Sequence, residues 1–160
     1  MKGFSIRNVL EIAIKAEDLG ITFYSELAHK FSANNVLRQV IELLAKDEVL
    51  HKRQFTDMLN LLKGDYRASD IDIQFLDDVD ISAYFKGMQA VDTSLKPSEI
   101  LMKAFEFEKA TVLYYLGIRD IIGSSTDLNE IIRIEKAHIT QIYKYLSEIK
   151  NGGTISDTWG

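Results

Sequence analysis

The sequence predicts an all-α protein, an antiparallel bundle of four long helices with a long crossover between the second and the third. Apolar residues recur at alternating steps of three and four along four segments, which is the spacing of one helical face. Each segment spans roughly 23 to 29 residues, and a glycine, a proline or a capping residue marks its ends. With 160 residues, 46% of them hydrophobic, the chain can bury one substantial core.

The first two helices are predicted over residues 5–31 and 34–62. Asn34 or Asn35 can cap the second helix, because a side-chain oxygen there can accept a hydrogen bond from the first turn. Gly64 stops this helix. The connection between the two helices is so short that they are expected to form an antiparallel hairpin.

The other two helices are predicted over residues 97–122 and 126–150. Pro97 with Ser98 opens the first of them, because proline is favoured at the first helical position. Gly123 ends it, and Thr126 or Asp127 starts the last helix. This short connection predicts a second antiparallel hairpin.

Residues 63–96 connect the two hairpins and are numerous enough to cross the length of a bundle. Their acidic stretch "ASDIDIQFLDDVD" lacks the glycine and glutamate that a calcium loop needs, so it is expected to be a solvated crossover. The stretch "ISAYFKGM" has room for a short helix. The bundle would occupy residues 1–150, and the tail, 151–160, is expected to be mobile unless Trp159 docks.

The composition excludes several classes of function. The chain has no cysteine, which removes disulfides, iron–sulfur clusters, thiolate zinc sites and cysteine nucleophiles. A net charge of −5 without a dense basic cluster argues against nucleic acid as a partner. No apolar run approaches the ~20 residues that cross a bilayer, and the start is too charged for a secretory signal. We expect a cytoplasmic protein that binds neither nucleic acid nor membrane.

Ionisable residues interrupt all four apolar stripes: Glu17, Glu48, His51, Glu108, Glu135 and His138. In the second and fourth helices, a histidine follows the glutamate by three residues, so each pair shares one helical face. In the first and third helices, a tyrosine follows the glutamate by seven residues, at Tyr24 and Tyr115. Seven residues are close to two turns, so each tyrosine points the same way as its glutamate. The chain therefore resembles a duplicated helical hairpin.

A third Glu-x-x-His pair, Glu26 with His29, is predicted to lie outside this set. Glu26 comes nine residues after Glu17, which places it about 180° around the helix. His29 continues a row of polar residues on the same face. We therefore expect this pair to face water.

Four buried carboxylates need a physical explanation, because each costs several kcal/mol unless it is neutralised or paired. No lysine or arginine lies on the four stripes near the glutamates. Two divalent cations would balance the four charges, with neutral histidines as further ligands. Carboxylates with one imidazole per metal suit iron, with manganese or zinc as alternatives, although the absence of thiolates disfavours a structural zinc site. The alternative is a metal-free bundle whose glutamates are protonated or hydrogen-bonded to the tyrosines. It explains the six matching ionisable positions less well than a di-metal site does.

Four motifs, "EDLGITFY", "DEVLH", "EKATVLYY" and "EKAH", resemble the ferritin-like superfamily, and most closely its rubrerythrin-like branch. The resemblance covers nearly all of residues 5–150. It implies a ferritin-like bundle with six di-iron ligands, Glu48 and Glu135 as bridges and Glu17 and Glu108 as terminal carboxylates: Glu17, Glu48, His51, Glu108, Glu135 and His138. Beside such a cluster, Tyr24 and Tyr115 are expected to hydrogen-bond the ligating carboxylates.

The resemblance implies a di-iron oxidoreductase that acts on hydrogen peroxide or dioxygen. Two departures bear on this activity: Thr111 stands where rubrerythrins carry an additional glutamate, and the four cysteines of a rubredoxin domain are missing. An external electron donor, such as a rubredoxin-type protein, is therefore expected, as is a homodimer or higher homo-oligomer. The alternatives are an iron-binding or storage protein of the ferritin type with ferroxidase activity, and a bundle that only mediates interactions.

Overall fold

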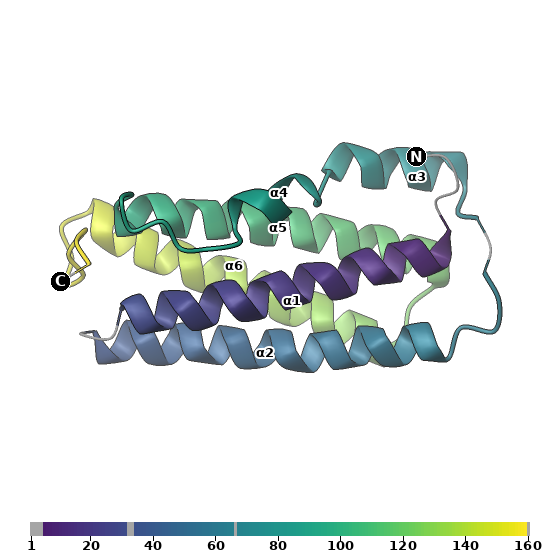
Figure 1. Ribbon diagram of the computed structural model, residues 1–160, viewed down its shortest axis with the longest axis horizontal. Helices are drawn as coiled ribbons and strands as arrows, with labels where there is room; N and C mark the ends of the chain where they lie inside the picture. Colours follow the sequence, from purple (N-terminus) through teal and green to yellow (C-terminus); the bar gives the residue numbers. More distant parts are fainter. Residues whose placement is uncertain (1–4, 32–33, 66, 160) are drawn as a thin grey trace.

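The computed structural model describes residues 5–31, 34–65 and 67–159, and it is an all-α, antiparallel four-helix bundle (Figure 1). The long helices are α1 (Ile6–Lys30), α2 (Asn35–Asn60), α5 (Pro97–Ile122) and α6 (Thr126–Lys150). Their ends differ from the ranges read from the sequence by at most two residues. The predicted fold class is confirmed. In the described part of the chain, no helix combines the length and the apolar character needed to cross a membrane.

Local capping interactions explain where the helices begin and end. The Asn34 side chain accepts a hydrogen bond from the backbone N–H of Leu37 at 3.1 Å, which caps α2. The Ser125 hydroxyl caps α6 by accepting from the N–H of Leu128 at 3.1 Å. Gly123 ends α5 with a φ of 89°, in the left-handed region that favours glycine. The caps at Asn34 and Ser125 use polar residues that lie between the apolar stripes in the sequence.

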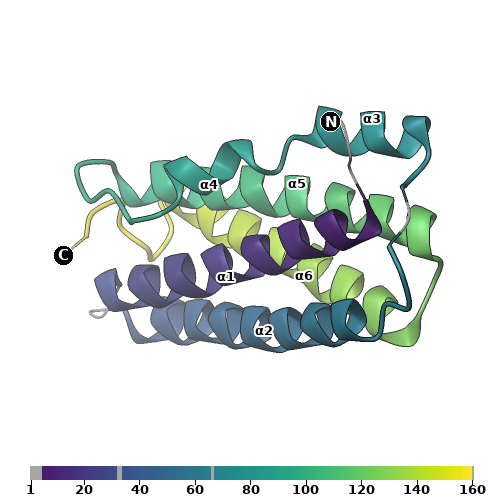
Figure 2. The same ribbon diagram turned by 45° about the vertical axis from the view of Figure 1, so that its right-hand side comes forward.

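The crossover carries the chain back along the whole bundle. Helix α2 ends near the place where α1 begins, and α5 starts at the opposite end of the molecule (Figure 1). The α1–α2 hairpin therefore lies beside the α5–α6 hairpin, with the crossover running along the outside of α5 (Figure 2). This arrangement lets all four long helices turn one face toward a common interior.

The acidic crossover differs from the solvated connection that its composition predicts. It contains a helix that was not expected, α3 (Asp70–Val79), before α4 (Ala83–Gly87), which is the short helix expected in "ISAYFKGM". Helix α3 buries Ile73 and Leu76, which are three residues apart and share one face. Gly117 of α5 permits the close packing, because a Cβ there would lie 2.6 Å from Leu76 Cδ2. The aspartates at 70 and 78 remain exposed, so the segment is an amphipathic helix docked on the bundle.

The C-terminal tail is docked rather than free. The Trp159 indole N–H donates to the carbonyl oxygen of Leu95 at 2.8 Å, and its ring packs against Phe31 with centroids 5.1 Å apart. The Asp157 carboxylate accepts from the backbone N–H of Ser98 at 2.8 Å and from its hydroxyl at 2.7 Å. An acceptor at this place satisfies a free N–H in the first turn of α5. The expectation of a mobile tail is therefore wrong, because Trp159 docks and Asp157 is held by hydrogen bonds as well.

Candidate metal centre

All six candidate ligands lie in the interior of the bundle, although each is ionisable. Helices α1 and α5 supply one glutamate each, and α2 and α6 supply one Glu-x-x-His pair each. Their exposed fractions do not exceed 2%: Glu17, Glu48, His51, Glu108, Glu135 and His138. They are buried because they occupy positions of the apolar stripes, which the helical period turns toward the common interior.

The six residues form two overlapping groups whose candidate ligand atoms lie within 4.8 Å of one another. One group contains Glu17, Glu48, His51 and Glu135, and the other contains Glu48, Glu108, Glu135 and His138. Each group has three carboxylates and one imidazole. Glu48 and Glu135 belong to both, which is the arrangement that two bridging carboxylates require.

Both imidazoles turn Nδ1 toward the carboxylates. His51 Nδ1 is hydrogen-bonded to Glu135 Oε1 at 2.8 Å and lies near the Glu17 carboxylate, 3.6 Å from its Oε1. His138 Nδ1 lies 3.2 Å from Glu48 Oε1 and 3.3 Å from Glu135 Oε2. The two rings are 6.2 Å apart between centroids. One imidazole therefore serves each group.

The two tyrosines bind carboxylates of the opposite half of the chain. The Tyr24 hydroxyl of α1 donates to Glu108 Oε1 of α5 at 2.6 Å. The Tyr115 hydroxyl of α5 donates to Glu17 Oε1 of α1 at 2.5 Å. Burial, and then the nearby carboxylate charge, raises the pKa of both phenols well above 10, so they remain neutral donors. Each tyrosine thus orients one candidate terminal ligand.

Burial governs the ionisation of the glutamates. It raises the pKa of Glu17, Glu48 and Glu108, and the charge of Glu135 raises these values further. Glu135 is also buried, but its close contacts with Glu108 and the two histidines outweigh this effect and lower its pKa well below 4.5. Four carboxylates at this distance can coexist only by taking up protons or cations.

The surroundings of the two histidines favour their protonated, charged forms. Burial alone would lower the pKa of His51, yet its hydrogen bond with Glu135 and the nearby Glu17 carboxylate raise that pKa to about 10. The pKa of His138 is also raised, because its hydrogen bond with Asp47 and the nearby carboxylates of the cluster outweigh burial. The cluster is therefore a strongly negative site that attracts positive charge.

The donor atoms fit a pair of divalent cations. In the described part of the chain, five of the six residues have a buried polar atom without a hydrogen-bond partner beside the other candidate ligands: Glu17 Oε2, Glu48 Oε1, Glu108 Oε2, Glu135 Oε2 and His138 Nδ1. Such an atom costs about 1–3 kcal/mol when nothing satisfies it. Carboxylate oxygens with imidazole nitrogens are donors that iron and manganese accept. The role of the six side chains as ligands remains a prediction that this geometry supports.

Gly20 is a contributor that the sequence interpretation missed. A Cβ at Gly20 of α1 would lie 2.6 Å from Glu48 Oε2, so the absent side chain makes room for this carboxylate. The residue at the corresponding position of α5 is Thr111, whose hydroxyl donates to the carbonyl of Phe107 at 2.9 Å. The signal was a glycine in the middle of a helix, three residues after a buried glutamate, where glycine costs about 0.5–1 kcal/mol relative to alanine.

Asp47 is a second residue that was missed. Its Oδ2 lies 2.9 Å from Nε2 of His138, on the side of the ring that faces away from the carboxylates. Asp47 comes from α2 and His138 from α6, so no spacing within one helix predicts the contact. The available signal was an acidic residue directly before Glu48 in "DEVLH".

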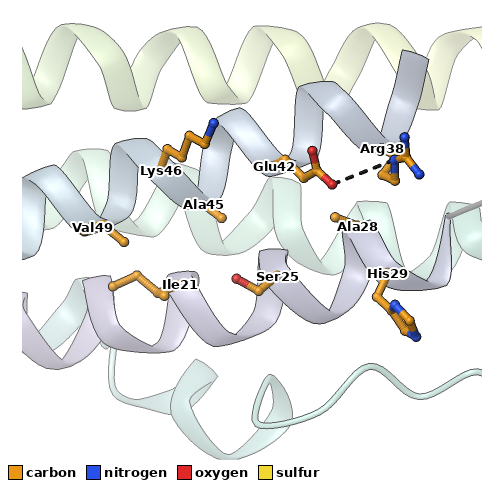
Figure 3. A pocket seen from close by; sticks show the side chains of 9 residues that line it. All are labelled: Ile21, Ser25, Ala28, His29, Arg38, Glu42, Ala45, Lys46 and Val49. Atoms are coloured by element: carbon orange, nitrogen blue, oxygen red, sulfur yellow. Dashed lines mark ion pairs between the residues drawn. The ribbon is translucent and has the colours of Figure 1, made fainter. Parts of the chain in front are cut away.

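The Glu26–His29 pair does not join the cluster. His29 is exposed and lies at one end of an outer groove of about 550 Å³ between α1 and α2 (Figure 3). Arg38 and Glu42, on the α2 side of this groove, form an ion pair one helical turn apart, with Arg38 Nε 3.7 Å from Glu42 Oε1. None of the six candidate ligands is among the described residues that line it. The groove is thus separate from the carboxylate cluster.

Comparisons with known proteins agree with this architecture. The family model of rubrerythrin matches residues 8–87, which is half of the chain and includes Glu17, Glu48 and His51. A solved structure from Thermotoga maritima, described as a ferritin-like diiron-carboxylate protein, superimposes with a TM-score of 0.66. The alignment has 21% identity and covers 91% of this chain and 96% of that chain, so it shows a shared fold. No curated protein matches the sequence.

Proposed function

This chain belongs to the rubrerythrin family, and from that membership and its buried cluster we propose that it is a di-iron oxidoreductase that reduces hydrogen peroxide or dioxygen with electrons from an external donor. The observation that carries the proposal is the pair of overlapping carboxylate–imidazole groups that share Glu48 and Glu135. The similar structure from Thermotoga maritima is also described as a diiron-carboxylate protein. Ferritin-type iron storage is the alternative.

The six cluster residues would hold the two ions. Glu17 and His51 would serve one ion, Glu108 and His138 the other, and the two shared glutamates both. When bound, a pair of iron ions supplies two electrons for reduction of an O–O bond. Reduction of one peroxide molecule to two waters consumes these two electrons and two protons. Because the chain has no cysteine, a rubredoxin-type partner or another external donor would return the electrons.

The surrounding side chains support this chemistry by holding the carboxylates in place. Tyr24 and Tyr115 each donate a short hydrogen bond to one terminal glutamate, which fixes its orientation and leaves its other oxygen without a hydrogen-bond partner among the described residues. The candidate ligands are at most 2% exposed, so a substrate must be small enough to pass between packed side chains. Peroxide and dioxygen meet that requirement, which favours them over larger organic substrates.

Steady-state turnover tests the proposal. Protein loaded with Fe²⁺ under anaerobic conditions is expected to consume hydrogen peroxide continuously when reduced rubredoxin is supplied. His29→Ala is the matched control and should retain full activity, because His29 is exposed and outside the cluster. A protein that oxidises Fe²⁺ and retains a mineral particle, without reductant-dependent peroxide consumption, would be a storage protein instead.

A further inference from the structure

The two histidines of the cluster differ at the nitrogen that faces away from the carboxylates. His138 Nε2 lies 2.9 Å from the Asp47 carboxylate, whose side chain is 39% exposed. His51 Nε2 is buried and has no hydrogen-bond partner in the part of the chain that the structure describes. His51 and His138 hold equivalent positions in the duplicated pattern, but only His138 has a hydrogen-bond partner at Nε2 among the described residues.

The duplicated motif explains the difference. Asp47 stands directly before Glu48 in "DEVLH". The corresponding residue, directly before Glu135 in "IEKAH", is Ile134. Isoleucine has no side-chain acceptor. Ile134 therefore cannot form with His51 the hydrogen bond that Asp47 forms with His138.

No other acid among the described residues takes over this role. Glu130, on α6, interacts electrostatically with His51, but no hydrogen bond joins their described atoms. The Glu130 carboxylate instead accepts two hydrogen bonds from the guanidinium of Arg133. His51 is therefore held only through Nδ1, on the side of the carboxylates.

From this difference, and resting on the di-metal centre proposed above, we propose that Asp47 is a positioning residue that makes the two metal positions unequal. The position served by His138 fills first and binds its ion more tightly. A carboxylate that accepts from Nε2–H keeps the proton on that nitrogen, directs the Nδ1 lone pair at the cluster and makes the imidazole a stronger ligand. Loss of such a partner commonly weakens metal binding by about 10- to 100-fold, and His51 lacks one.

Stepwise binding of Co²⁺ to the full chain tests the inference. Co²⁺ alone is titrated anaerobically against a competing chelator, and its visible absorption reports each occupied position. The wild type is expected to bind two ions in steps that differ by about 10- to 100-fold in affinity. His138→Ala should remove the tight step, and His51→Ala should remove the weak one.

Reciprocal variants at the two equivalent positions identify the cause. Asp47→Ala is expected to weaken the tight step by about 10- to 100-fold, so that the two steps merge. Asp47→Asn keeps an acceptor oxygen and should restore part of the loss, which a merely structural role would not predict. Ile134→Asp should strengthen the weak step. Asp57→Ala, an exposed aspartate on the same helix, is the matched control and should change neither step.

Three results would overturn the inference: equal steps in the wild type, equal weakening of both steps by Asp47→Ala, or loss of the tight step in His51→Ala. Failure of the wild type to bind Co²⁺ at all would overturn both this inference and the proposed function. Two unequal steps that respond to Asp47 as described, in a protein without peroxide turnover, would support the inference and overturn only the proposed activity.

Discussion

The α1–α2 hairpin and the α5–α6 hairpin present the same ligand pattern, but they surround it with different residues. In the first hairpin, Gly20 leaves space that the Glu48 carboxylate occupies. At the corresponding place of the second, Thr111 is buried and its hydroxyl bonds its own helix backbone. Among the described residues, only the first hairpin has an acid, Asp47, that contacts the Nε2 atom of a cluster histidine of the other hairpin. A repeated set of ligands therefore does not make the two halves equivalent.

Neither hairpin is complete without the other. Tyr24 orients Glu108, and Tyr115 orients Glu17, so each terminal carboxylate depends on a hydroxyl from the opposite half. His51 likewise contacts Glu135 from the other hairpin. The cluster is thus a product of docking between the two hairpins, and substitutions at equivalent positions reveal where the halves differ.

Glu135 and Glu48 should give the largest contrast. Glu135→Leu removes the carboxylate that both histidines contact, so we expect the metal-free protein to lose about 3–5 kcal/mol in free energy of unfolding at pH 7. Glu48→Leu removes a carboxylate whose ionised form is destabilised by burial and neighbouring charge, so we expect a gain of about 1–4 kcal/mol. Denaturant unfolding with chelator measures both. Both variants should also lose the two-ion site, because each glutamate is shared.

If Glu135→Leu and Glu48→Leu change the free energy of unfolding in the same direction, the proposed electrostatic difference between these glutamates is contradicted. Metal analysis of the same preparations provides the control. If either variant still holds two ions per chain, that glutamate is not a shared ligand.

The metal-free protein should lose stability as the pH rises. The raised pKa values of Glu17, Glu48 and Glu108 mean that their stabilising contribution is complete below the unfolded value of 4.5 and is lost as the pH passes the folded values. His51 acts in the same direction, between its ordinary value of 6.5 and about 10. Glu135 has a lowered pKa, so its contribution is lost only as the pH falls below 4.5.

Thermal melts of chelator-treated protein between pH 5 and pH 10 would show this trend. Bound Fe²⁺ should oppose it at neutral pH, because cations favour the ionised carboxylates and bind only the native site. The gap between the loaded and metal-free melts should shrink in acid, where protons compete for the ligands. A metal-free melting temperature that rises from pH 6 to pH 9 would refute the buried-charge argument.

The two tyrosines should give equal, moderate effects. Tyr24→Phe and Tyr115→Phe each remove one buried hydrogen bond between the halves, which is expected to lower the free energy of unfolding by about 1–2 kcal/mol. Denaturant unfolding of the single and double variants measures the losses and their additivity. A loss in only one variant would show that the crossed pairs are not equivalent.

The smallest expected contrast is between Gly20→Ala and Thr111→Ala. Alanine at position 20 gains about 0.5–1 kcal/mol of helix stability, but its Cβ displaces the Glu48 carboxylate, so the net change in unfolding free energy should stay within about 1 kcal/mol. Metal affinity should nevertheless fall. Thr111→Ala removes only a bond to its own helix backbone, and Co²⁺ affinity should be unchanged. Equal affinities in both variants would remove the proposed role of Gly20.

Much of the fold could be predicted from local patterns. Each long helix is amphipathic over more than six turns, and caps such as Asn34 and Ser125 are local, so the four helices and the all-α class follow from residues near one another in the chain. The crossover was harder to predict. In α3, burial of only two residues, Ile73 and Leu76, depends on a distant partner, Gly117, and the acidic composition concealed this short apolar face.

The sequence by itself determined which ionisable side chains face the interior, because a helix has a fixed period and Glu17, Glu48, Glu108 and Glu135 interrupt its apolar stripes. It also separated Glu26 and His29 from them by the same period. Only the tertiary structure decided that Tyr24 reaches Glu108, that Asp47 reaches His138 and that Gly20 accommodates Glu48. These contacts join different helices, so they depend on the rotation and axial offset at which the helices pack, and no spacing within one helix encodes those two quantities.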